Sequence, residues 1–168
     1  LKANERARYD ELAVFPEDVN IPLSTLGKFW ASTGSTNGFD AEFDTEELCT
    51  RLNRLSLLHT FDARARHIRL HDVVRHYLMH DQCDRLPALH KQFLDAHRPS
   101  SSSLDSHFSP WSALPEDDPY FWDHLAVHLI QSGLGSELVV TVTDWRYLTQ
   151  KILLRKTHSV ESDLLKAT

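Results

Sequence analysis

The residues from 67 to 78 change their hydrophobic period midway, and this change constrains the fold more than any other feature of the chain. Between 67 and 70, apolar residues alternate with polar ones, which is typical of a strand with one buried face. From Asp72 on, the apolar residues follow the spacing of one helical face: Val73, Val74, Tyr77 and Leu78. The sequence therefore predicts a short strand that leads directly into a helix, with His71 at the junction.

This junction puts His71 beside the first turn of the predicted helix. The N–H groups of a first turn have no partners within the helix and carry the positive end of its dipole, so anions bind there. Asp72 is expected to cap the helix through its side chain. Two interpretations stay open at this point: His71 contacts a bound phosphate, or it is an ordinary junction residue without a ligand.

Helices are predicted ahead of this junction. A helix over 5–15 should end at Pro16, because proline and the residue before it disfavour helical backbone. A second helix should have Pro22 in its first turn and bury apolar residues at helical spacing, namely Leu23, Leu26 and Trp30.

A third helix should begin at Asp44, because Glu47 follows at the position that a capping box requires. Strands over 57–61 and 67–70 then form a β-hairpin. Three helices followed by a hairpin is the order of a winged-helix domain, and we assign residues 5–81 to it.

The rest of the chain, residues 85–168, predicts a helical domain. Its helices are expected over 86–96, 120–132, 136–143 and 145–154, the last one capped by Asp144. A Ser/Pro-rich loop at 98–119 interrupts them, and its four serines at 100–103 are expected to be mobile because they have nothing to bury. The predicted fold class is therefore mainly α: a winged-helix domain with one small β-hairpin, followed by an α-helical bundle.

Composition excludes several classes of protein. A net charge of −6 gives no electrostatic footprint for nucleic acid. No apolar run approaches the roughly 20 residues of a spanning helix, so no membrane partner is expected. The two cysteines are read as free thiols in a reducing, cytoplasmic compartment. Because the chain starts at Leu1, we expect a piece of a longer polypeptide.

Catalytic chemistry is not indicated. Histidine pairs at i, i+4 spacing, such as His124 and His128, suit a zinc site, but no third ligand is evident and no metal is predicted. The chain has no phosphate-binding loop and no nucleophile elbow, so it is not expected to be an enzyme. The rival hypotheses are a winged-helix DNA-binding regulator, using Arg64, Arg66 and Arg69 of the turn and hairpin, and a metal-dependent enzyme.

Two motifs resemble those of NB-ARC proteins, the STAND-class signalling NTPases. Leu70-His71-Asp72 is similar to the family's "MHD" triplet, with Leu in place of Met. Phe15-Pro16-Glu17-Asp18 and the following Ile21, Leu26 and Trp30 resemble its "FPED…I…L…LW" segment. Met79-His80-Asp81 also spells the triplet, but it falls late in the predicted helix, where no free N–H groups meet an anion.

The second half resembles the helical domain of the apoptotic protease-activating-factor branch. The residues that carry this resemblance include Leu89-His90, His124-Leu125 and Asp144-Trp145. The resemblance implies a regulatory arm, with ADP or ATP held mainly by a nucleotide-binding domain upstream in cis. His71 would sense the nucleotide, supported by Leu70 and Asp72. A C-terminal repeat domain in cis, of the WD-repeat type, would act as sensor, and the full-length protein would form a homo-oligomer on activation.

Overall fold

The structure is a computed structural model that describes residues 1–34, 41–99, 109–155 and 157–167, without the side chains of 41–43. The chain divides into two compact units, Leu1–Ala96 and His97–Thr168. The first unit thus includes most of the helix that we assigned to the second domain. The serine run at 100–103 lies outside the described residues, so its predicted mobility stays a prediction.

The fold class is confirmed: the chain is mainly helical, with one small antiparallel sheet. The first unit begins with α1 (Ala3–Glu11) and a 3-10 turn, η1 (Leu12–Val14), and Phe15 is extended ahead of Pro16. β1 (Ile21–Pro22), α2 (Leu23–Thr33) and α3 (Ala41–Arg54) follow. The predicted burial of Leu23, Leu26 and Trp30 in α2 is confirmed.

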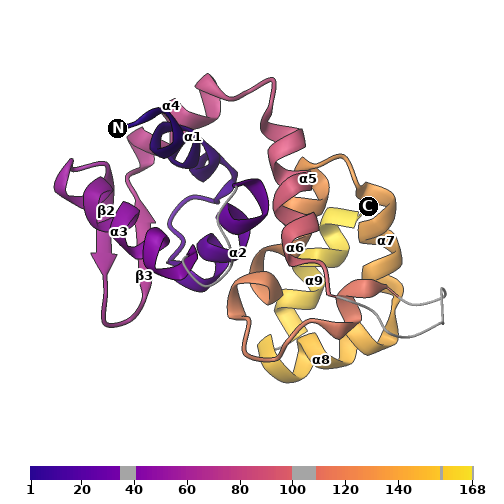
Figure 1. The fold of residues 1–168 in the computed structure, drawn as a ribbon. Coiled ribbons are helices and arrows are strands. Elements are labelled where there is room, and N and C mark those ends of the chain that lie inside the picture. The colour runs from indigo at the N-terminus through magenta and orange to yellow at the C-terminus, as the bar shows by residue number, and fades with distance from the viewer. Residues whose placement is uncertain (35–40, 100–108, 156, 168) are drawn as a thin grey trace. The chain divides into compact units, whose positions relative to one another are not determined.

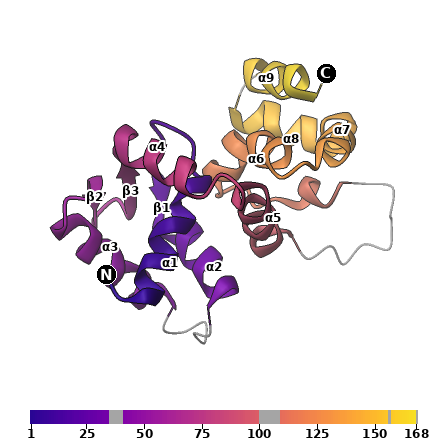
Figure 2. The same cartoon turned by 90° about the horizontal axis from the view of Figure 1, so that it is seen from above.

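The hairpin is confirmed as β2 (Leu58–Asp62) and β3 (His67–Leu70), which run antiparallel beside α3 (Figure 1). The Asp62 carboxylate accepts hydrogen bonds from the N–H groups of Arg64 and Ala65, which fixes the turn between the strands. β1 pairs with the other edge of β3, so the sheet has the order β1-β3-β2 (Figure 2). The two residues of β1 are too few to show an alternating pattern.

Two predicted helix starts were wrong. Pro22 is not in the first turn of α2: it has extended backbone, pairs with His67 in the sheet and occupies the cap position. A proline is tolerated there because an edge strand does not need every N–H. α3 begins at Ala41, so Asp44 lies inside the helix instead of capping it.

The first unit is completed by α4 (Asp72–Asp81) and α5 (Leu86–His97). The aromatic ring of Phe93 in α5 packs edge-on against Phe15 and Phe29, with ring centroids 5.3 and 5.1 Å apart. All three side chains are fully buried. These contacts explain why α5 belongs to the same compact unit as the sheet.

The second unit consists of a 3-10 turn, η2 (Pro110–Ala113), and four helices: α6 (Pro119–Gln131), α7 (Gly135–Thr143), α8 (Trp145–Arg155) and α9 (Thr157–Ala167). The predicted cap of α8 is confirmed, because the Asp144 carboxylate accepts the N–H of Arg146 at 2.9 Å. Trp122 stacks on Tyr147 in the core, and α9 packs against the other three helices (Figure 1). Within the described residues, no helix is long and apolar enough to cross a membrane.

Candidate functional site

His71 lies where the sequence predicted it, between the last residue of β3 and the first residue of α4. Its backbone is extended, and its carbonyl accepts the N–H of Arg75 at 2.9 Å as the first bond of the helix. The imidazole is exposed and makes no capping hydrogen bond. Leu70, just before it, is buried and pairs with Leu58, so the strand holds the position of the junction.

Asp72 does not cap α4, which corrects the prediction. The last extended residue is His71, so the cap position falls one residue earlier and Asp72 is already helical. Its carboxylate still stands in the first turn, where a negative charge is favourable toward the helix dipole. Its carbonyl is 2.8 Å from Nδ1 of His76. Asp72 therefore supports the start of the helix electrostatically.

The predicted apolar face of α4 was only partly right. Leu78 is fully buried, but Val73 is 81% exposed and Tyr77 is 51% exposed. The helix turns Leu78 toward the core and leaves the other two at the surface, where the Tyr77 hydroxyl meets the Arg6 guanidinium at 3.4 Å. A period of apolar residues shows which helical face is apolar, and not whether a neighbour covers it.

The two family-type motifs, about fifty residues apart in sequence, contact each other in the structure. The Arg69 guanidinium forms an ion pair with the Asp18 carboxylate. On the helical side of the junction, Nε of Arg75 donates to the carbonyl of Phe15 at 2.8 Å. The Phe15–Asp18 segment is therefore tied to the chain on both sides of His71, and it fixes β3 and α4 relative to each other.

His90, in α5, is 3% exposed, so its imidazole is held away from water. Burial, and secondly the positive charge of Arg75, lower the pKa of its imidazole from 6.5 to about 4. Below about pH 6.5 the His90 imidazole of the unfolded chain binds a proton, whereas that of the folded unit stays neutral down to about pH 4. We therefore expect the free energy of unfolding to fall by up to about 3 kcal/mol between about pH 6.5 and pH 4.

Denaturant unfolding as a function of pH measures this loss. His90→Gln cannot titrate and should reduce the slope of stability against pH. The same substitution at the exposed His80 should leave that slope unchanged. A slope that is equal in the wild type and in His90→Gln would show that His90 is not the source.

The second triplet, Met79-His80-Asp81, lies in the last turn of α4, as predicted. That end of a helix presents carbonyl groups, which repel an anion. In the His124–His128 pair, His128 is fully buried, and its Nε2 is 2.8 Å from the Tyr120 hydroxyl, so that nitrogen already has a protein partner. Across the described ranges, no group of three or more ligand-type residues could hold a metal ion.

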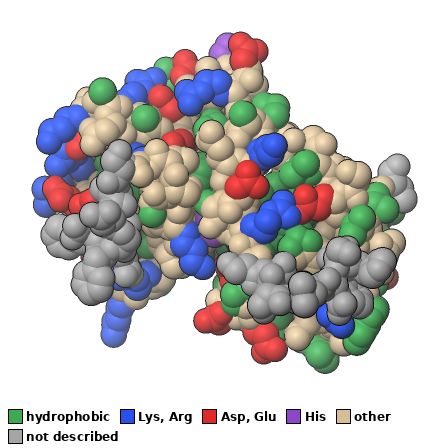
Figure 3. Space-filling view, turned by 45° about the vertical axis from the view of Figure 1, so that its right-hand side comes forward, with side chains coloured by type: hydrophobic (Ala, Val, Ile, Leu, Met, Phe, Trp, Pro, Cys, Tyr) green, Lys and Arg blue, Asp and Glu red, His purple; other side chains and the backbone are tan. Residues whose placement is uncertain are grey.

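Two of the three arginines named for DNA contact are paired with acidic side chains. The partners are Glu46 for Arg66 and Asp18 for Arg69. On the face shown in Figure 3, acidic and basic side chains are interspersed. Binding to a phosphate backbone needs a surplus of positive charge, and these ion pairs offer none.

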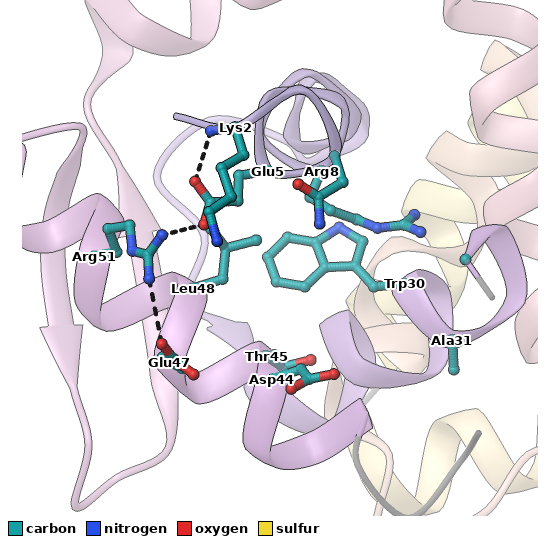
Figure 4. Close-up of a pocket in the computed structure, with 12 residues that line it drawn as sticks. Lys2, Glu5, Arg8, Trp30, Ala31, Asp44, Thr45, Glu47, Leu48 and Arg51 are labelled. Carbon is teal, nitrogen blue, oxygen red and sulfur yellow. Dashed lines mark hydrogen bonds and ion pairs between the residues drawn. The ribbon is translucent and has the colours of Figure 1, made fainter. Parts of the chain in front are cut away.

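A cavity of about 490 Å³ lies among α1, α2 and α3 (Figure 4), away from the 67–78 stretch. Trp30 forms part of its wall, and its buried indole N–H has no hydrogen-bond partner among the described residues. The charged residues of the lining balance each other, with Lys2, Arg8 and Arg51 facing Glu5, Asp44 and Glu47. Balanced charge of this kind does not favour a phosphate.

Known proteins resemble this chain over its second half and, more weakly, over most of its length. Residues 86–168 match the family described as the APAF-1 helical domain. The apoptotic protease-activating factor 1 of Danio rerio is 23% identical over 147 residues, which cover 86% of this chain and 11% of that protein. Both findings support an NB-ARC-like fragment of the apoptotic protease-activating-factor type. The chain thus spans a small part of its relative's length.

Proposed function

We propose that this chain is the regulatory winged-helix and helical arm of a cytoplasmic STAND/NB-ARC ATPase switch. One observation carries the proposal: His71 presents an exposed imidazole, without a capping hydrogen bond, at the N-terminus of α4. A ring in that position can donate to a phosphate that the helix dipole also attracts. Within residues 5–81, the helix–strand–helix–helix–strand–strand order ahead of α4 supports the winged-helix assignment.

In this proposal the arm distinguishes ADP from ATP. An upstream nucleotide-binding domain of the same polypeptide holds the nucleotide, and His71 donates a hydrogen bond to the β-phosphate in the closed, ADP-bound state. Leu70 fixes the junction from the core, and Asp72 stabilises the first turn. A ligand shifts such an equilibrium only through its different affinity for the two states, and His71 supplies the difference.

Exchange for ATP then releases the arm, and the protein assembles into a homo-oligomer. Residues 85–168 relay the movement to a C-terminal sensor, which we propose is a WD-repeat domain. The match of residues 86–168 to the APAF-1 helical domain supports this part. In this proposal the arm would regulate the switch without supplying a catalytic residue or a metal ligand.

Calorimetry with ADP tests whether the upstream domain, and not this arm, holds the nucleotide. Residues 1–168 offer one phosphate contact, so they should bind ADP hardly at all, whereas a chain extended upstream through the nucleotide-binding domain should bind it. The sequence upstream should contain a phosphate-binding loop. Micromolar affinity in residues 1–168 would contradict the proposal, as would an upstream sequence without that loop.

A further inference from the structure

His59 stands against His71 in a way that the sequence did not indicate. The centroids of the two imidazole rings are 4.9 Å apart, and the ring planes meet at 76°, which is an edge-to-face contact. His59 belongs to β2, and its side chain is exposed. The contact therefore joins the hairpin to the start of α4 at the residue that we propose as the nucleotide sensor.

An irregularity in the sheet explains how His59 reaches this place. Leu58 pairs with Leu70, but Thr60 pairs with Arg69, so β2 has one more residue than β3 over this step. That extra residue is His59, and the register shift has the form of a β-bulge. Bulges change the direction of a side chain and are common beside functional sites. Here the bulge keeps Leu58 buried beside Leu70 and leaves His59 to turn toward His71.

We infer that His59 is a positioning residue that holds the His71 ring in the orientation needed to donate to a phosphate. The inference rests on the proposed function of His71. An exposed side chain without a capping bond has several rotamers to choose from, and a donor must meet its acceptor at a defined distance and angle. A ring packed edge-to-face removes part of that freedom before the ligand arrives, which strengthens binding.

The test uses the full-length protein and measures its affinity for ADP. Removing the ring with His59→Ala should weaken ADP binding about two- to tenfold, the range expected for one aromatic contact. His59→Phe keeps a ring but no nitrogen, and it should restore affinity to near the wild-type value. Thr60→Ala, at the next exposed position of β2, is the matched control and should change nothing.

A double variant separates positioning from direct contact with the ligand. If His59 acts through His71, then His59→Ala should add no further loss to His71→Ala. If His59→Phe and His59→Ala bind ADP equally weakly, the inference is overturned, because the imidazole nitrogen would then be needed. Wild-type affinity in His59→Ala would also overturn it, provided that His71→Ala loses ADP. If His71→Ala itself keeps ADP, the proposed function fails, and this inference fails with it.

Discussion

Asp163→Ala should lower the free energy of unfolding of the second unit by about 3–5 kcal/mol, the usual cost of removing one partner of a buried ion pair. The Lys151 and Asp163 side chains are 1% and 3% exposed, and they form an ion pair between α8 and α9. The Tyr147 hydroxyl donates to the same carboxylate at 3.1 Å. Burial lowers the pKa of Lys151, and the Asp163 carboxylate opposes this shift. Without Asp163 a cation would stay buried and unpaired, or would have to lose its proton.

Denaturant unfolding of residues 1–168, followed by tryptophan fluorescence, measures this loss. Glu161→Ala removes an exposed carboxylate from the same helix and is the matched control. The double variant Lys151→Met/Asp163→Leu replaces the pair by apolar side chains, and it should recover most of the stability. If Asp163→Ala loses no more free energy of unfolding than Glu161→Ala, the ion pair does not stabilise the packing of α9.

His71→Ala should shift the full-length protein from its closed state toward its open state. A hydrogen bond to a charged group contributes about 1.5–3 kcal/mol. At about 1.4 kcal/mol per tenfold, the closed-to-open ratio should fall roughly ten- to a hundredfold. Because the side chain is exposed and makes no capping bond, the fold should be unaffected. Light scattering should therefore detect self-association without the activating trigger, at an unchanged unfolding temperature.

Unchanged oligomer size in His71→Ala, together with a lower unfolding temperature, would indicate a structural role instead. Tyr77→Ala is a useful control, since it removes a half-exposed side chain from the same helix without approaching its N-terminus. It should leave the protein in its resting form.

Local patterns predicted most of the fold. The alternation over 67–70 placed β3 correctly, because period and burial coincide in that strand. The helical spacing after it placed α4 and His71 correctly, although only part of the apolar face of α4 is buried. The predicted caps Asp44 and Asp72 both lie inside the observed helices. The sequence could not separate these positions, because a carboxylate near the start of a helix stabilises it whether or not it occupies the cap position. The exposure of Val73 was missed because burial depends on neighbouring elements.

The surroundings of His71 depend on tertiary pairing, which explains why the sequence showed only one residue of the site. The contact of His59 with His71 follows from a register shift in the β2–β3 ladder, and a bulge has no signature in Leu58-His59-Thr60. The ion pair of Arg69 with Asp18 likewise joins two segments that only the sheet brings together. Both features need the partner strand before they can be recognised.

The amount of ADP that remains bound to the purified full-length protein tests the central claim most directly. It should be compared between the wild type and three single variants: His71→Ala, His76→Ala and His80→Ala. We predict that His71→Ala retains clearly less ADP. The other two variants should stay near the wild type, because His76 lies in the middle of α4 and His80 in its last turn, away from the N-terminus of the helix. Release by His80→Ala but not by His71→Ala would mean that the other triplet is the sensor. Full retention in all three variants would contradict a phosphate-sensing role for this helix.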